Sequence, residues 1–197
     1  MKPYIQGDLG GLCGVYSVIN ATRIVAGLDR DESEKLFSSV MDYIGDARLV
    51  ADGIGIRMIG RLLRDVVGGQ IPYRSMPFRT DRTATLNEVW RSLNNFLQDH
   101  HRAAIIWLGW SGSEGREGHW TTVCGAKPRQ LFLVDSAHYH VLNKGTCTVG
   151  SSSKKRPHVL YPPCVYLCSD SPIGALSRRL NTAAIPGSKS SPPYLHS

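Results

Sequence analysis

The sequence has no long apolar run, and its first residues lack a hydrophobic stretch. A transmembrane helix needs about 20 consecutive apolar residues, and no segment of the 197-residue chain approaches that length. The N-terminal residues MKPYIQGDLGG include one lysine and none of the apolar core of a secretory signal peptide. We therefore expect a protein without a membrane span that is cytoplasmic as synthesised, and any export would follow a non-Sec route.

Cysteine is scarce and odd in number. Five cysteines do not form the even framework of a small, disulfide-stapled secreted domain. Only Cys164 and Cys168 lie close together, without a matching second pair, so no zinc site is predicted. Cys124, Cys164 and Cys168 fall in apolar, strand-like runs and are predicted to be small core residues.

Acidic residues are fewer than basic ones: the chain has 16 Asp and Glu and 23 Lys and Arg, and its formal net charge is +7. The arginines are spread along the chain, and the densest basic run is Lys154-Lys155-Arg156 in a serine-rich stretch. An excess of positive charge of this kind can favour the binding of nucleic acid or of an acidic protein partner. Because no nucleic-acid-binding motif accompanies it, a solvated surface is the simpler interpretation, and nucleic acid is not the expected partner.

Apolar periodicity divides the chain into a helical first half and a strand-rich second half. Hydrophobic residues make up 42% of the chain, which suits one folded domain over residues 1–184 and a disordered tail over 185–197. Helical spacing predicts helices over 14–26, 31–44, 55–67 and 85–99. Strand-like runs cover 102–110, 119–127, 131–136, 138–143 and 163–168, and the glycine-rich segment 111–118 is predicted to be a flexible loop. This order predicts an α+β fold with an antiparallel sheet.

Cys13 stands where the first predicted helix begins, directly after a glycine-rich stretch. The free N–H groups and the dipole of a helix N-terminus lower the pKa of a thiol and make it a better nucleophile. Gly11 would leave room for a substrate backbone. The side-chain amide of Gln6, with the backbone N–H of Cys13, could bind an oxyanion. Taken singly, Cys13 also fits a small buried residue and Gln6 a surface residue.

His119 opens a predicted strand and Asp135 closes the next one, with a turn between them. If the two strands form a hairpin, both side chains lie at the same end, and Asp135 can orient the imidazole as a general base. Gly118 and Trp120 flank His119 and are predicted to contact substrate, although Trp120 could also be partly core. His138 and His140 would share one strand face and lie close to Asp135 in the sequence, but no third ligand appears at a fitting spacing, so no metal or other cofactor is predicted.

These motifs together resemble the papain-like cysteine peptidases. The string from Gln6 through Cys13-Gly14, the segment Gly118-His119-Trp-Thr-Thr-Val and the segment Leu-Phe-Leu-Val-Asp135 are similar to the branch that removes double-glycine leaders from bacteriocin precursors. The chain looks like a stand-alone member without a transporter. The resemblance implies a papain-like fold, with Cys13 as nucleophile, His119 as base, Asp135 as orienting acid and Gln6 in the oxyanion hole.

Three functions are compatible with this set of residues. The first is a thiol peptidase that cleaves a peptide or isopeptide bond of a protein substrate through a Cys-His-Asp triad. The second uses the same acyl-enzyme chemistry as a deamidase or acyltransferase, in an effector or toxin that modifies a target protein. The third is a catalytically silent peptide-binding domain. The sequence predicts neither the substrate nor the oligomeric state.

Overall fold

The computed structural model describes residues 10–45, 52–112, 115–135 and 139–173. Gln6, His138 and the tail expected over 185–197 lie outside these residues. The described part combines helices with an antiparallel sheet, as expected for the α+β class. None of its helices is both long enough and apolar enough to cross a membrane.

The first predicted helices are present, and their ends follow the local sequence. Helix α1 spans Cys13–Ala26, and Gly27 ends it in the left-handed conformation at φ 70°. Helix α2 spans Arg30–Ile44 and begins with a capping box between Asp29 and Glu32. The predicted helix over 55–67 is divided into α4, Ile56–Arg61, and a π-helical turn, η2, Leu62–Val66.

Eight strands form one sheet, in the order β1-β8-β2-β3-β4-β5 with β7 beside β2 and β6 beside β7. Their bounds are β1 Tyr73–Ser75, β2 Arg102–Gly112, β3 Gly115–Lys127, β4 Gln130–Val134, β5 Val141–Asn143, β6 Cys147–Thr148, β7 His158–Leu160 and β8 Tyr166–Ser169. The β6–β7 pair is parallel, and the other pairs are antiparallel. The sequence did not indicate β1, β6 or β7.

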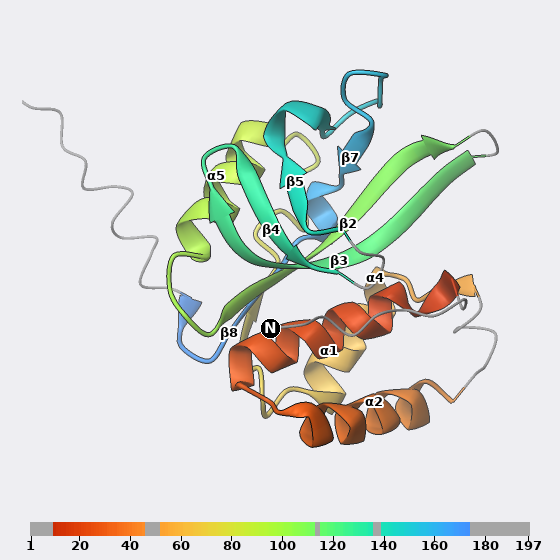
Figure 1. The fold of residues 1–197 in the computed structure, drawn as a ribbon, viewed down its shortest axis with the longest axis vertical. Helices are drawn as coiled ribbons and strands as arrows, with labels where there is room; N and C mark the ends of the chain where they lie inside the picture. The colour runs from red at the N-terminus through yellow and green to blue at the C-terminus, as the bar shows by residue number, and fades with distance from the viewer. Residues whose placement is uncertain (1–9, 46–51, 113–114, 136–138, 174–197) are drawn as a thin grey trace, which may run out of the picture.

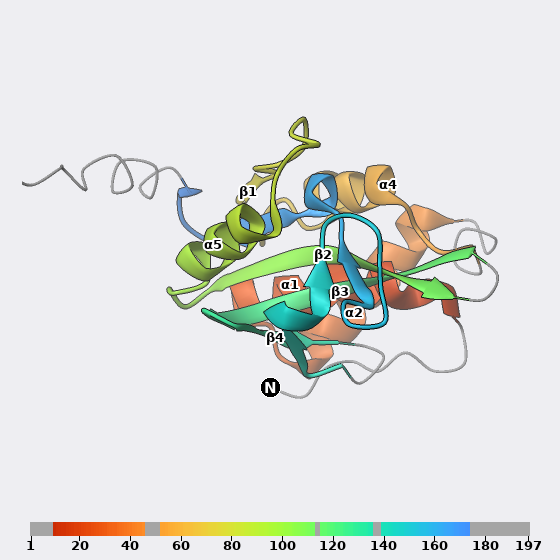
Figure 2. The same ribbon diagram turned by 90° about the horizontal axis from the view of Figure 1, so that it is seen from above.

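Helices cover both faces of this sheet. Figure 2 shows α1 and α2 on one side of β2 and β3, and α5 (Leu86–Phe96) on the other. Alternate residues of β2 serve the two layers: Ile105 packs with the α1 cluster and Ile106 with the α5 cluster. The helices therefore do not form a single layer, and β1 precedes α5 in the chain. Helix α5 begins with the predicted capping box of Thr85 and Glu88.

Two expectations from the sequence are wrong. Residues 111–112 and 115–118 of the predicted loop are strand, because β2 and β3 continue their ladder from Gly109↔Gly118 to Gly112↔Gly115. Cys124 is exposed instead of buried. It lies at a β-bulge between Val123 and Gly125, and a bulge changes the direction in which a side chain points.

Candidate functional site

Cys13 is the first residue of α1 and lies against the sheet. A short 3-10 turn, η1 (Gly10–Leu12), leads into the helix, and only 6% of the Cys13 surface is exposed. The hydroxyl of Ser17 donates to the carbonyl oxygen of Cys13 at 2.8 Å, one turn further along. The thiol thus stands at the positive end of a helix that is 14 residues long.

The β3–β4 hairpin brings His119 and Asp135 together, as the sequence predicts. Its register pairs Thr122 with Val134, so the two residues lie just beyond the same end of the ladder. Nε2 of His119 is 2.7 Å from Oδ2 of Asp135. The backbone N–H of Tyr139 donates to the other carboxylate oxygen at 3.4 Å. Both side chains are buried, with 7% of His119 and 1% of Asp135 exposed.

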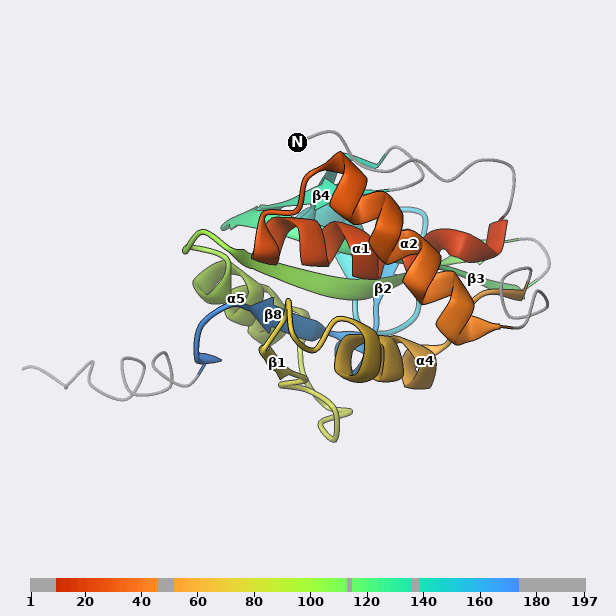
Figure 3. The same cartoon turned by 90° about the horizontal axis from the view of Figure 1, so that it is seen from below.

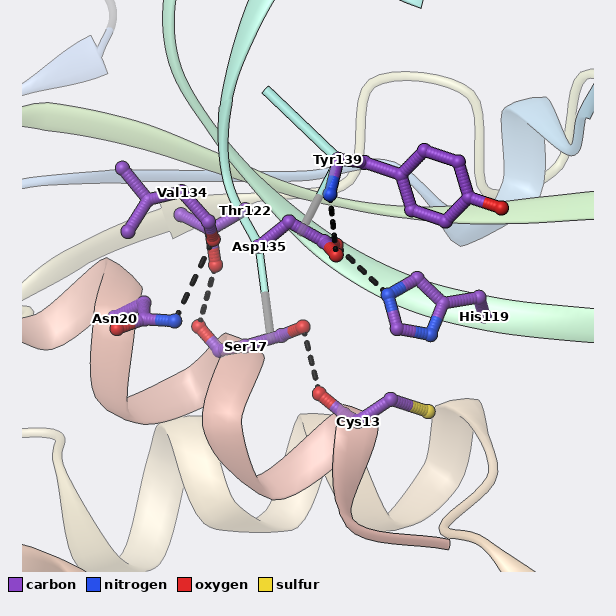
Figure 4. Close-up of polar contacts among 8 residues, drawn as sticks. All are labelled: Cys13, Ser17, Asn20, His119, Thr122, Val134, Asp135 and Tyr139. Carbon is purple, nitrogen blue, oxygen red and sulfur yellow. Dashed lines mark hydrogen bonds and ion pairs between the residues drawn. The ribbon is translucent and has the colours of Figure 1, made fainter. Parts of the chain in front are cut away.

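The imidazole connects the carboxylate to the thiol. Figure 4 shows the second ring nitrogen of His119 turned toward the sulfur of Cys13, away from Asp135. Burial lowers the pKa of His119, but the hydrogen bonds to Asp135 and to Cys13 and the charges of both outweigh it and raise this pKa to about 9. A ring with this pKa carries a proton at neutral pH.

The pKa of the Cys13 thiol moves in the opposite direction. Burial alone raises it, but the hydrogen bond to His119, the backbone N–H of Trp120, the charge of His119 and the backbone N–H of Gly14 together lower it. The Trp120 N–H is available because β4 pairs with β3 only as far as Thr122, so Trp120 lies beyond that ladder. The arrangement favours a thiolate–imidazolium pair.

Buried hydrogen bonds fix α1 to the strands that carry the other two groups. The hydroxyl of Thr122 donates to the carbonyl oxygen of Ser17 at 2.8 Å, and the side-chain amide of Asn20 donates to the carbonyl oxygen of Val134 at 3.4 Å. These contacts link one face of α1 to both β3 and β4 (Figure 4). The position of Cys13 relative to His119 therefore depends on the sheet as well as on the helix.

A pocket of about 550 Å³ opens beside Cys13. The predicted substrate-binding residues Gly11, Gly118 and Trp120 all line it. Trp120 also belongs to the core, and its indole N–H donates to the carbonyl oxygen of Ile54 at 2.8 Å. This bond holds the segment around Ile54 as one wall of the pocket.

Another part of the pocket lining is aromatic and tightly packed. Trp107 meets Tyr161 edge to face, with ring centroids 4.7 Å apart. A Cβ on Gly118 would lie 1.7 Å from Cζ2 of Trp107, so the indole occupies the space that a side chain would need. The role of Tyr161 and of the wall at Ile54 had no signal in the sequence, because both arise from contacts between distant segments.

The structure therefore gathers Cys13, His119 and Asp135 at one site, together with three predicted pocket residues, while Gln6 lies outside the described residues. In the described residues no three His, Cys, Asp or Glu side chains group as metal ligands, and all five cysteines are free. Of the three cysteines predicted for the core, Cys168 is buried and Cys164 is half-buried at the pocket wall.

Comparison with protein-family models, with curated proteins and with solved structures gives no match to this chain.

Proposed function

We propose that this protein is a cysteine hydrolase that cleaves a peptide or isopeptide bond of a protein substrate. The observation that carries the proposal is the connected set of Cys13, His119 and Asp135, in which Cys13 lines a pocket. A structural cysteine needs neither a paired imidazole nor a pocket, whereas a nucleophile needs both.

In the proposed reaction, the thiolate of Cys13 attacks the substrate carbonyl carbon and forms a tetrahedral intermediate. The proton held by His119 passes to the leaving amine, the C–N bond breaks, and a thioester to Cys13 remains. His119 then takes a proton from water, the hydroxide attacks the thioester, and the acid product leaves as the thiol is restored. Asp135 keeps the imidazole oriented and stabilises its charge throughout.

The negative charge on the substrate oxygen needs donors in the tetrahedral intermediate. The backbone N–H of Cys13 at the start of α1 and the side-chain amide of Gln6 are the proposed pair. With a nucleophile at a helix start and a base and an acid on a packed hairpin, the arrangement fits the papain-like fold. The resemblance to stand-alone relatives of the double-glycine leader peptidases then supplies the proposed family.

A mixture of proteome-derived peptides, incubated with wild-type protein and with Cys13→Ala, tests the proposal. We expect new peptide termini with the wild type only. Peptides in which glutamine has become glutamate would indicate a deamidase in place of a peptidase. Peptides in which an acyl group has been joined to an amine would indicate an acyltransferase. A Cys13 thiol that iodoacetamide labels no faster than free cysteine at about pH 6, with no altered peptide, would indicate a silent binding domain.

The control is Cys168→Ala, because Cys168 is fully buried away from the pocket and burial raises the pKa of its thiol to about 12. This variant should retain the activity of any sample that remains folded. New peptide termini produced by Cys13→Ala would remove Cys13 from its proposed role. Loss of activity in a Cys168→Ala sample that has a wild-type circular dichroism spectrum would show that the loss in Cys13→Ala is not specific to the nucleophile.

A further inference from the structure

Six arginines that are scattered in the sequence meet in one groove of about 1020 Å³. We call it the arginine groove, and its basic residues are Arg57, Arg61, Arg64, Arg74, Arg79 and Arg82. The first three follow one another at helical spacing on α4 and η2, the fourth is in β1, and the last two belong to the segment 76–84. Figure 3 shows this segment projecting beside α4. All six side chains are exposed.

The positive charge of the groove is poorly balanced by the described carboxylates. No Asp or Glu of the described chain lines it. Asp65 binds Arg64 at 2.7 Å and accepts from the hydroxyl of Tyr43, while Asp81 accepts from the N–H and hydroxyl of Thr83. Arg64 is thus the single arginine of the six with an ion pair to a described residue. Five further guanidinium groups in one concavity create a field that attracts an anionic partner.

The arginine groove adjoins the pocket of Cys13. Ile56 lines both, and the turn η4 (Pro162–Cys164) gives Pro163 to the groove and Cys164 to the pocket. The hydroxyl of Tyr166 donates to the carbonyl oxygen of Ile56 at 2.8 Å and fixes this shared wall. A chain that occupies the groove can therefore continue into the pocket.

The lining of the groove favours polypeptide carboxylates over nucleic acid. Single-stranded nucleic acid is held by bases stacked on accessible aromatic rings. Among the described lining residues the sole aromatic is Tyr166, which is 6% exposed and whose hydroxyl is already bonded. Guanidinium groups match carboxylates in a fork of two hydrogen bonds, and the half-buried Ile56 and Met76 add apolar contacts for intervening side chains.

We propose that the arginine groove binds an acidic segment of the polypeptide substrate and guides a neighbouring bond to Cys13. This inference rests on the proposed function, because it names the substrate class of the same site. The segment is rich in Asp and Glu and lies outside the reacting bond, so that it contributes to the choice of substrate and not to the chemical step.

Two peptides that each carry an iodoacetyl group test this proposal on the full chain. They differ only in a run of glutamates in one and glutamines in the other, and each is made with the iodoacetyl group at either end. The measured quantity is the ratio of Cys13 labelling rates, acidic over neutral. We expect a ratio of about ten, because several exposed charge pairs each contribute a small factor to binding, and the ratio should decline as salt is added.

The decisive variants are Arg61→Glu with Arg79→Glu in the groove, and Arg91→Glu with Arg129→Glu as a control of equal charge. Arg91 and Arg129 are exposed and lie outside the groove. The ratio should fall to about one in the groove variant and stay near ten in the control. Replacement of Arg61 and Arg79 by Gln should give an intermediate ratio if the reversed pair fails to fold.

A wild-type ratio of about one, or a ratio equal in both variants, would overturn the proposal. So would stronger protection of Cys13 by a single-stranded oligonucleotide than by the free acidic peptide, since that result assigns the groove to nucleic acid. Labelling by iodoacetamide alone is the separate readout for the proposed function. A reactive thiol with a ratio of one rejects the docking groove, and an unreactive thiol rejects the hydrolase.

Discussion

Nε2 of His119 lies 2.7 Å from Oδ2 of Asp135, and the side chain of Asp135 is completely buried. A buried carboxylate keeps its charge only when partners compensate for the lost water. The imidazole is an ionisable partner of this carboxylate, so each group stabilises the charged form of the other. The same bond leaves the second ring nitrogen facing Cys13 (Figure 4), which makes the carboxylate a positioning residue for the thiol.

Replacing Asp135 with Asn should slow the alkylation of Cys13. The amide can hold the ring but cannot stabilise its charge, so the pKa of His119 should fall and that of Cys13 should rise. Each pKa unit reduces the thiolate fraction below the pKa about tenfold, and iodoacetamide labelling at about pH 6 should decrease by at least that factor. Asp170→Asn removes an exposed carboxylate as the control. Equal labelling of Asp135→Asn and wild type would contradict the assignment.

The pH dependence of stability should differ between wild type and Cys13→Ala. A folded-state pKa of His119 raised above its usual 6.5 stabilises the protein fully below that pH, and the contribution is lost as pH rises toward about 9. The lowered pKa of Cys13 acts in the opposite direction, since its contribution is present above the ordinary pKa of 9.0 and is lost as pH falls. The two contributions therefore offset each other in wild type between these pH values.

Without the thiol, only the pair of His119 and Asp135 remains. The free energy of unfolding of Cys13→Ala should therefore decrease as pH is raised from about 6 to about 9. Urea denaturation at both pH values measures this, and the double variant Cys13→Ala with Asp135→Asn is the reference because its histidine loses the charged partner. An equal pH dependence of the two variants would show that Asp135 does not stabilise the imidazolium.

The sequence was sufficient for the parts of the site that have local signals. Gly27 ends α1, and the capping box at Thr85 starts α5, because both depend on neighbouring residues. The His119–Asp135 contact was predictable for a related reason. A short turn joins two apolar strands, so the register of the hairpin follows from the turn and the apolar pattern.

Other features depend on contacts that no local pattern encodes. Strand β1 exists because Arg74 and its neighbours pair with β8, about a hundred residues later. The end of β2 and the start of β3 have a glycine-rich sequence typical of a loop, yet a ladder needs only backbone groups, and Gly118 also makes room for Trp107. The arginine groove has the same origin, since the fold gathers charges that the sequence separates.

A methyl group at position 118 should disturb the pocket wall. In Gly118→Ala the new Cβ would overlap the ring of Trp107, and overpacking of this kind costs about 1–3 kcal/mol of unfolding free energy. Gly55→Ala is the matched control, because Gly55 lines the same pocket and a methyl group added there would have no neighbouring atom within 4 Å. Urea denaturation should show that Gly118→Ala lowers the free energy of unfolding less in a Trp107→Leu background than in the wild type. An equal decrease in both backgrounds would show that the methyl group does not act through Trp107.

Two adjacent threonines of β3 allow a test of the hydrogen bond that holds α1 against the sheet. Thr122 donates to the carbonyl oxygen of Ser17 at 2.8 Å, whereas the hydroxyl of Thr121 is buried without a hydrogen-bond partner in the described structure. Thr122→Val should therefore lower the free energy of unfolding by about 1 kcal/mol.

Thr121→Val should be neutral or stabilising, because it removes a buried polar group that nothing satisfies. Because the hydrogen bond of Thr122 also positions α1, Thr122→Val should slow iodoacetamide labelling of Cys13, and Thr121→Val should leave it unchanged. Urea denaturation curves and iodoacetamide labelling rates of both variants, measured side by side, test these two expectations. If the two valines had the same effect on both quantities, the hydrogen bond to Ser17 would not be what holds Cys13 beside His119.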